Sequence, residues 1–138
     1  MIEFSYQINF TLEKAEEVAA WISEIIISEG FVEGEINYVF CDDDYLLKLN
    51  KEFLDHDTLT DIISFDYSLG TELHGEIYIS IDRVRENAIK FEVSFDKELH
   101  RVIIHGILHY CGYKDKSEID AALMRKKEDE ALLARRFC

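Results

Sequence analysis

The feature that most constrains this fold is an apolar segment, residues 99–110, that carries two histidines four positions apart. His105 and His109 stand among the aliphatic residues 102–104 and 107–108. On an α-helix, residues at i and i+4 lie on one face, so both imidazoles point the same way and can share one ion. The aliphatic neighbours indicate a buried helix, where an unpaired polar ring costs about 1–3 kcal/mol. The chain is therefore expected to fold around a central helix whose histidines need a partner.

Gly112 and Asp115 extend this pattern beyond the helix. Glycine readily adopts the left-handed conformation that ends a helix and reverses the chain, so the Asp115 carboxylate can return over the histidines. Three such ligands leave one position of a zinc ion open for water or substrate, which is typical of a catalytic site. The spacing resembles that of metzincin proteases, but Gly106 stands where H-E-x-x-H has its catalytic Glu, so peptide hydrolysis by that route is not expected. We predict one zinc ion, or another divalent transition metal, bound by His105, His109 and Asp115.

The rest of the chain alternates between strands and helices. Alternating apolar residues predict a first strand at residues 2–10, and further strands are expected at residues 34–41, 62–67 and 76–81. Helices are expected from a cap at Thr11 to Gly30, at residues 42–53, from a cap at Asp82 to residue 91, from Ser94 or Asp96 to Gly112, and at residues 117–135. The prediction is one α/β (α+β) domain over residues 1–138, with a small mixed four-stranded sheet, about five helices and the metal site on the central helix.

Composition limits the class of function. The net charge of −14 argues against a generic nucleic-acid binder, whose surface should be basic. The charge is uneven, because residues 1–70 have 3 Lys/Arg against 16 Asp/Glu, whereas residues 71–138 have 12 against 13. Three scattered cysteines without a C-x-x-C pair indicate a reducing compartment, and neither a signal segment nor a long apolar run is present. We therefore expect a cytoplasmic protein. The basic residues of the second half indicate either ordinary solvated helix charges, the favoured interpretation of any single residue, or a local surface that faces polyanions.

Three segments resemble one known family. Residues 105–115 (HGILHYCGYKD) resemble H-G-x-L-H-x-x-G-Y-D-H, the signature of the YbeY family of bacterial rRNA maturation factors. Residues 60–65 (TDIISF) are similar to T-N-V-L-S-F in that family, and residues 75–80 (GEIYIS) to G-D-I-x-I-S. The resemblance implies a metal-dependent, single-strand-specific endoribonuclease, with zinc, that acts in 16S rRNA 3′-end maturation and ribosome quality control. Its implied partners are ribosomal RNA, pre-ribosomal particles and ribosomal proteins, with no membrane and no DNA.

Two departures from the family pattern bear on activity. Asp115 stands where the family has its third histidine, and an anionic ligand makes the ion acidify water less and favours harder ions. Leu54 stands where the resemblance places an arginine that is important for activity in the family. His56 nearby could make a polar contact, although a loop histidine is more often simply solvated. A ribosome assembly factor without catalysis, which keeps the metal site, and a metal-dependent hydrolase of another substrate therefore stay open as alternatives.

The catalytic base is not identified by the sequence. Glu76 and Asp66 are candidates only because they lie on strands expected to line a cleft, and a solvated carboxylate or a helix cap is the favoured interpretation of each. Thr60 and Ser64 are candidate substrate-binding residues, because their hydroxyls can donate hydrogen bonds to a phosphate. A structural role in a turn is the alternative for both.

Overall fold

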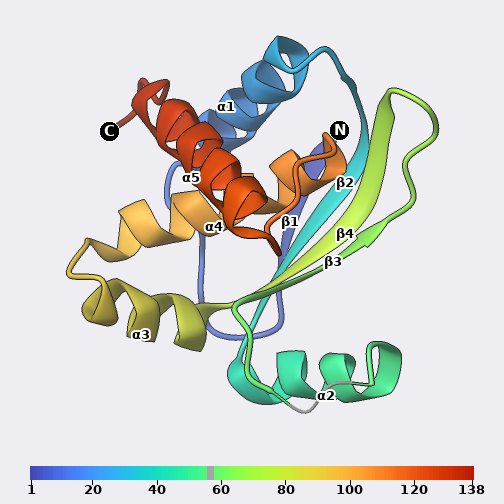
Figure 1. Cartoon of the computed structure of the whole chain (residues 1–138). Helices are drawn as coiled ribbons and strands as arrows, with labels where there is room; N and C mark the ends of the chain where they lie inside the picture. The colour runs from blue at the N-terminus through green and yellow to red at the C-terminus, as the bar shows by residue number, and fades with distance from the viewer. Residues whose placement is uncertain (56–57) are drawn as a thin grey trace.

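The computed structural model describes residues 1–55 and 58–138 and confirms the expected α+β architecture (Figure 1). The elements in chain order are β1 (Ile2–Tyr6), α1 (Ala15–Ser28), β2 (Val32–Cys41), α2 (Asp43–Phe53), β3 (Ile62–Asp66), β4 (Glu72–Ser80), α3 (Ile81–Lys90), α4 (Phe95–Tyr110) and α5 (Glu118–Leu133). The sheet has the order β1-β2-β4-β3, in which β1, β2 and β4 are parallel and β3 is an antiparallel edge strand. The sheet is therefore mixed and four-stranded, as the sequence predicts. None of the described helices is long and apolar enough to cross a membrane.

Helix α4 is the centre of the molecule. It lies between the sheet and helices α1, α3 and α5, and its residues Ile103, Ile104 and Ile107 are fully buried. Gly106 lets the helix approach the sheet, because a Cβ atom there would lie 3.0 Å from Ile77 Cδ1. The prediction of a buried central helix is confirmed, and Gly106 has a packing role.

Helix α2 covers the opposite face of the sheet. Its Leu46 packs with Ile63 of β3 and Cys41 of β2 in a small second core. The neighbouring Ile62 packs against the main core instead, since successive residues of a strand face opposite sides. The main core and α4 thus occupy one face of the sheet, and α2 occupies the other.

The first strand and the first helix are shorter than predicted. Tyr6, the last residue of β1, pairs with Phe40 of β2. Strand β2 ends at the next residue, Cys41, so among the described residues β1 has no partner strand beyond this point. Helix α1 begins at Ala15 after Lys14, whose φ is 54°, so the prediction that Thr11 caps this helix was wrong. The intervening residues carry the chain from the sheet edge to the helical layer.

Two boundaries around β4 also differ from the prediction. Ser80, not Asp82, caps α3, because the Ser80 hydroxyl accepts a hydrogen bond from the Arg83 N–H at 3.2 Å. Gly75 lies inside β4 and not in the preceding loop. A Cβ atom there would overlap the Tyr110 hydroxyl, so this glycine allows α4 to pack against the strand.

Candidate metal centre

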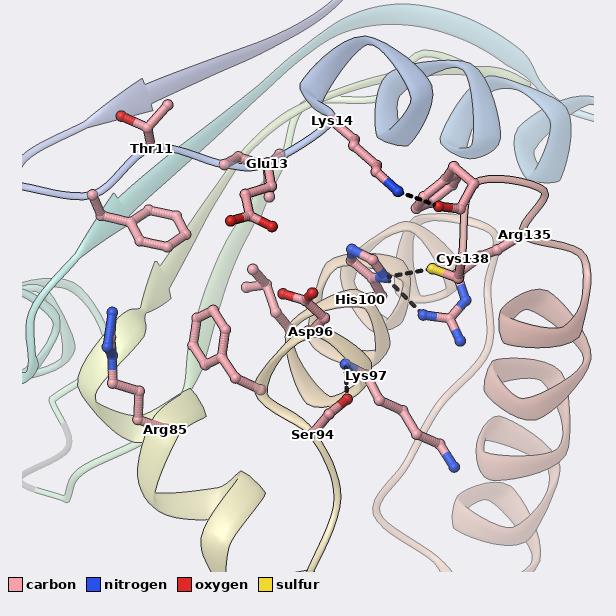
Figure 2. Close-up of a pocket in the computed structure, with 15 residues that line it drawn as sticks. Thr11, Glu13, Lys14, Arg85, Ser94, Asp96, Lys97, His100, Arg135 and Cys138 are labelled. Atoms are coloured by element: carbon pink, nitrogen blue, oxygen red, sulfur yellow. Dashed lines mark hydrogen bonds between the residues drawn. The ribbon is translucent and has the colours of Figure 1, made fainter.

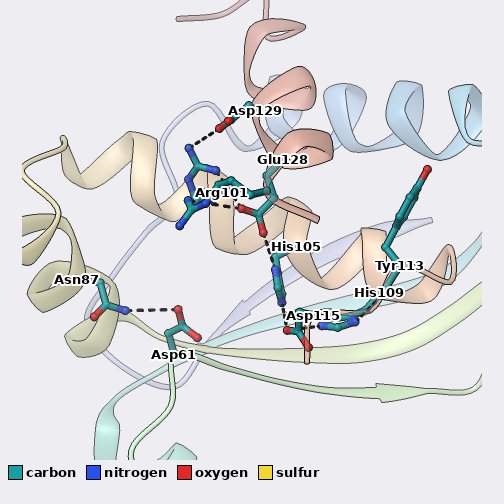
Figure 3. A network of polar contacts seen from close by, with 10 residues as sticks. Asp61, Asn87, Arg101, His105, His109, Tyr113, Asp115, Glu128 and Asp129 are labelled. Atoms are coloured by element: carbon teal, nitrogen blue, oxygen red, sulfur yellow. Dashed lines mark hydrogen bonds and ion pairs between the residues drawn. The ribbon is translucent and has the colours of Figure 1, made fainter. Parts of the chain in front are cut away.

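The three predicted ligands come together at the C-terminal end of α4 (Figure 3). The Nε2 atom of His105 lies 3.2 Å from Asp115 Oδ2, and the Nε2 atom of His109 lies 3.1 Å from the same oxygen. One ligand atom from each of the three residues lies within 4.8 Å of the others. Zinc–ligand bonds of about 2.0–2.2 Å in a tetrahedral arrangement separate two donors by roughly 3.3 Å, so these donor atoms are spaced closely enough to share one ion.

The chain reversal after α4 places Asp115. Gly112 has a φ of 100°, and its N–H donates to His109 O at 3.0 Å, which closes the last turn in the left-handed conformation expected there. Beyond it, the Tyr113 hydroxyl donates to Glu29 Oε1 of α1 at 2.6 Å, and Lys127 of α5 forms an ion pair with Glu29 at 2.9 Å. Side chains from two other helices therefore fix the loop that carries Asp115.

Hydrogen bonds at Nδ1 orient both rings. His109 Nδ1 lies 2.9 Å from Tyr113 O, a carbonyl oxygen that can only accept, so His109 carries its proton at Nδ1. His105 Nδ1 lies 2.6 Å from Glu128 Oε2. Burial lowers the pKa of His105, but the hydrogen bond and charge of Glu128, with the charges of Asp115 and Asp61, raise it overall. Both Nε2 atoms therefore face Asp115, and both rings have a partner at Nδ1 of the kind that metal-binding histidines use.

Glu128 is a site residue that the sequence did not reveal. It comes from α5, is 5% exposed, and also accepts a hydrogen bond from Arg101 Nη1 at 3.0 Å. Arg101 is in turn paired with Asp129 at 2.8 Å. No sequence signal marks Glu128, because it lies 23 residues from His105 in a helix that reads as a charged surface helix.

A cavity of about 430 Å³ opens beside the three residues. The three proposed ligands and both predicted substrate-binding residues, Thr60 and Ser64, line it. The other lining residues come from α3 and its C-cap, from α4 and α5, and from the start of β3 and the residue before it, namely Asp61, Ile62, Asn87, Phe91, Glu98, Arg101, Val102, Arg125 and Glu128. The structure thus brings the predicted site residues to one cavity, and other helices add residues that the sequence did not indicate.

The two carboxylates proposed as bases lie elsewhere. Glu76 lines a separate cavity on the sheet and accepts a hydrogen bond from the Tyr67 hydroxyl at 3.3 Å. Asp66 is exposed and accepts the Ser68 N–H at 2.9 Å in the turn after β3. The described residues that line the metal-side cavity include neither of them, so this expectation was wrong. Leu54 is the exposed C-cap of α2, and His56 lies outside the described residues.

A larger cavity, of about 550 Å³, lies at the other end of α4 (Figure 2). Its buried polar residue is His100, whose Nδ1 accepts a hydrogen bond from Arg135 Nη1 at 2.7 Å. Burial, with a smaller contribution from Arg135, lowers the pKa of His100 to about 4, so the ring is neutral at pH 7. Among the described residues, the three-ligand cluster occurs only at the other cavity, which makes that smaller cavity the candidate reaction site.

The fold itself has a known counterpart of moderate similarity. The solution structure of TM1509 from Thermotoga maritima matches with a TM-score of 0.67 and 29% identity, covering 96% of this chain and 87% of that one. This places the chain in a class of small α+β proteins with a four-stranded sheet.

Sequence comparison then identifies the family. The model of the family Endoribonuclease YbeY matches residues 3–135. A protein named Endoribonuclease YbeY from Flavobacterium psychrophilum is 63% identical over 132 residues, which are 96% of this chain and 94% of that protein. One of the same name from Flavobacterium johnsoniae is 59% identical, over 96% and 95% of the two chains. The chain belongs to the YbeY family, and the resemblance drawn from its motifs is confirmed.

Proposed function

We propose that this protein is a zinc-dependent endoribonuclease, specific for single strands, that acts in the cytoplasm in 16S rRNA 3′-end maturation and ribosome quality control. The observation that carries the proposal is the approach of two imidazole Nε2 atoms, at 3.2 and 3.1 Å, to one oxygen of Asp115 beside an open cavity. The names of the relatives supply the reaction type, endoribonucleolytic cleavage. Ribosomal RNA, pre-ribosomal particles and ribosomal proteins are the proposed partners.

The donor set fits a transition-metal ion. His105, His109 and Asp115 provide two nitrogens and one carboxylate oxygen, a combination that zinc accepts while keeping one position open. When bound, the ion supplies Lewis acidity, which acidifies a water molecule and draws charge from a phosphodiester oxygen. The carboxylate of Asp115 reduces that acidity relative to a third imidazole and makes manganese a stronger competitor for the site.

The surrounding residues bind and orient the substrate in this proposal. Thr60 and Ser64 present hydroxyls to the cavity, where they donate hydrogen bonds to phosphate oxygens. Arg101 is committed to Glu128 and Asp129, whereas the Arg125 side chain is 57% exposed and lies 3.7 Å from Glu128. Arg125 is therefore the cation best placed to pair with a phosphate, in place of the arginine that is absent at Leu54.

A second candidate function is a ribosome-binding assembly factor that keeps the metal without cleaving RNA. Two observations favour it: the net charge of −14, and Leu54 in place of the arginine that the family resemblance implies. A metal-dependent hydrolase of another substrate is the third possibility. All three have the same metal site, so only an activity measurement separates them.

The test combines metal analysis with RNA cleavage. The protein is purified without added metal, its metal content is measured, and it is then incubated with single-stranded and structured RNA, with and without a chelator. The proposal expects about one zinc per chain, cleavage of the single-stranded RNA, and loss of both metal and cleavage in His109→Ala. Cleavage by a demonstrably metal-free His109→Ala protein would refute metal dependence. A zinc-loaded wild type that binds ribosomal particles without cutting RNA would support the assembly factor.

A further inference from the structure

Asp61 is a carboxylate in the candidate cavity that does not belong to the three-ligand cluster. It stands directly before β3, and its backbone is fixed because the Ser80 N–H donates to Asp61 O at 2.9 Å. Its side chain lines the cavity of about 430 Å³ together with the three proposed ligands. Figure 3 shows the Asp61 carboxylate joined to the Asn87 amide and separate from the cluster of His105, His109 and Asp115. Asp61 thus lines the same cavity as the proposed ligands, from the segment directly before β3.

The groups around Asp61 come from three helices. The charges of His105 on α4 and Glu128 on α5 shift the pKa of the Asp61 carboxyl in opposite directions. The Asn87 amide nitrogen of α3 lies 3.5 Å from Asp61 Oδ2. Burial raises the pKa of Asp61, and the negative charge of Glu128 acts in the same direction. His105 and the hydrogen bonds from Asn87 and the Asp61 N–H oppose this rise without cancelling it. Glu98 of α4 is the other nearby acid, and its own pKa is raised by burial and then by the charge of Asp61.

The other carboxylates of the cavity are occupied or enclosed. Glu128 accepts hydrogen bonds from His105 and Arg101, and Glu98 is only 5% exposed. Asp61 has only the long contact with Asn87 and the bond from its own N–H among the described residues, so it keeps lone pairs free toward the cavity. Of the described carboxylates that line the cavity outside the three proposed ligands, Asp61 is the one whose oxygens are open to the cavity and can accept a proton there.

We propose that Asp61 is the general base of the reaction, a role that rests on the proposed endoribonuclease function. The carboxylate accepts a proton from the water whose oxygen attacks the phosphorus atom. As the new O–P bond forms, the P–O bond to the leaving ribose oxygen breaks and its electron pair stays on that oxygen. The leaving oxygen takes a proton from solvent, and Asp61 later releases its own proton to solvent, so charge and atoms balance.

Asp61 also offsets the effect of Asp115. With Asp115 as an anionic third ligand, a bound ion would be a weaker Lewis acid, so the attacking water would depend more on a protein base such as Asp61.

The test compares Asp61→Asn with Asp66→Asn, which makes the same chemical change at the other end of β3 and outside the cavity. Each protein is loaded with one equivalent of zinc, checked by elemental analysis, and kcat/KM is measured against pH on a single-stranded oligoribonucleotide. We expect Asp61→Asn to lose about 10²–10⁴-fold in kcat and the acidic limb of the profile, while KM, zinc content and melting temperature stay unchanged. Asp66→Asn is expected to behave as the wild type.

A second readout does not depend on cleavage. In the metal-free protein, the carboxyl carbon of Asp61 is followed by NMR against pH, and its midpoint is expected above the ordinary value of 3.8. A kcat of Asp61→Asn equal to that of Asp66→Asn, loss of zinc from Asp61→Asn, or a midpoint at or below 3.8 would each overturn the role as base. If the zinc-loaded wild type cleaves no RNA, the endoribonuclease proposal fails, and the role of Asp61 as base fails with it. A wild type that cleaves RNA and an Asp61→Asn variant that cleaves it equally well would refute the role of Asp61 alone.

Discussion

Replacing Glu128 by glutamine tests whether α5 holds the metal site in shape. The Glu128 carboxylate now accepts one bond from His105 Nδ1 at 2.6 Å and another from Arg101 Nη1 at 3.0 Å. A glutamine has one acceptor oxygen, and its NH₂ group must face one of these two donors. The charge of Arg101 draws the glutamine oxygen, so the NH₂ group turns toward His105 Nδ1, and the imidazole loses the acceptor that holds Nε2 toward Asp115.

The size of the effect follows from this geometry. Changing the hydrogen-bond partner of a ligating histidine typically costs 10–100-fold in metal affinity, which is about 1.4–2.7 kcal/mol. The Glu128 side chain is 7% exposed and its bond to His105 is short, so water cannot readily replace it. We therefore expect Glu128→Gln to fall in the upper half of that range.

The assay is a competition for zinc between the protein and a chromophoric chelator at neutral pH. The matched control is Asp129→Asn, because Asp129 is the next residue of α5 and bonds the same Arg101 at 2.8 Å, yet makes no contact with His105 in the described structure. Glu128→Gln should weaken zinc binding far more than Asp129→Asn. Equal affinities for the two variants would show that the Glu128–His105 bond does not support the site.

Three further predictions address stability and metal choice. Folding lowers the pKa of His100 from 6.5 to about 4. Between pH 6.5 and pH 4 the unfolded chain is therefore protonated at His100 and the folded chain is not, so the free energy of unfolding decreases as the pH falls through this range. The loss reaches about 3 kcal/mol by pH 4, and denaturation of His100→Gln at pH 7 and pH 4.5 should show a smaller difference than the wild type. Gly75→Ala should destabilise by about 1–3 kcal/mol in urea unfolding, because its Cβ overlaps the Tyr110 hydroxyl. Asp115→His should increase the preference for zinc over manganese in competition binding, and an unchanged preference would contradict the hard-ligand argument.

Short-range sequence patterns predicted which side chains come together where local geometry decides the outcome. The i, i+4 spacing places His105 and His109 on one helical face, and Gly112 reverses the chain through its own backbone freedom. Asp115 then lies beside both rings, as the spacing predicts, and its role as a metal ligand stays a prediction. The boundaries of β1 and α3 were missed because they depend on where a partner strand ends and on the hydroxyl of Ser80.

The residues that act on the ligands were not predictable in the same way. Glu128 contacts His105 from α5, and Asp61 lines the same cavity from the segment before β3; α5 and β3 pack against α4 only in the folded chain. In the sequence, each is one acid among 29 Asp and Glu residues. The sequence does not distinguish an acid that binds a buried histidine from a solvated surface acid, because the difference lies in a contact that forms only in the folded chain.

The charge distribution also limits how such a protein can recognise RNA. With a net charge of −14, the chain repels a polyanion at long range, but at physiological salt the repulsion is screened beyond about 8 Å. Within the cavity, Arg101 is neutralised by Glu128 and Asp129, which leaves Arg125 as the exposed cation of that wall. Capture must therefore depend on a few short contacts around the reaction site, and each phosphate contact contributes only about 0.7 to the salt slope on a single strand. Because only one or two cations contact phosphates in so acidic a protein, we expect RNA affinity to decrease only weakly with rising salt concentration.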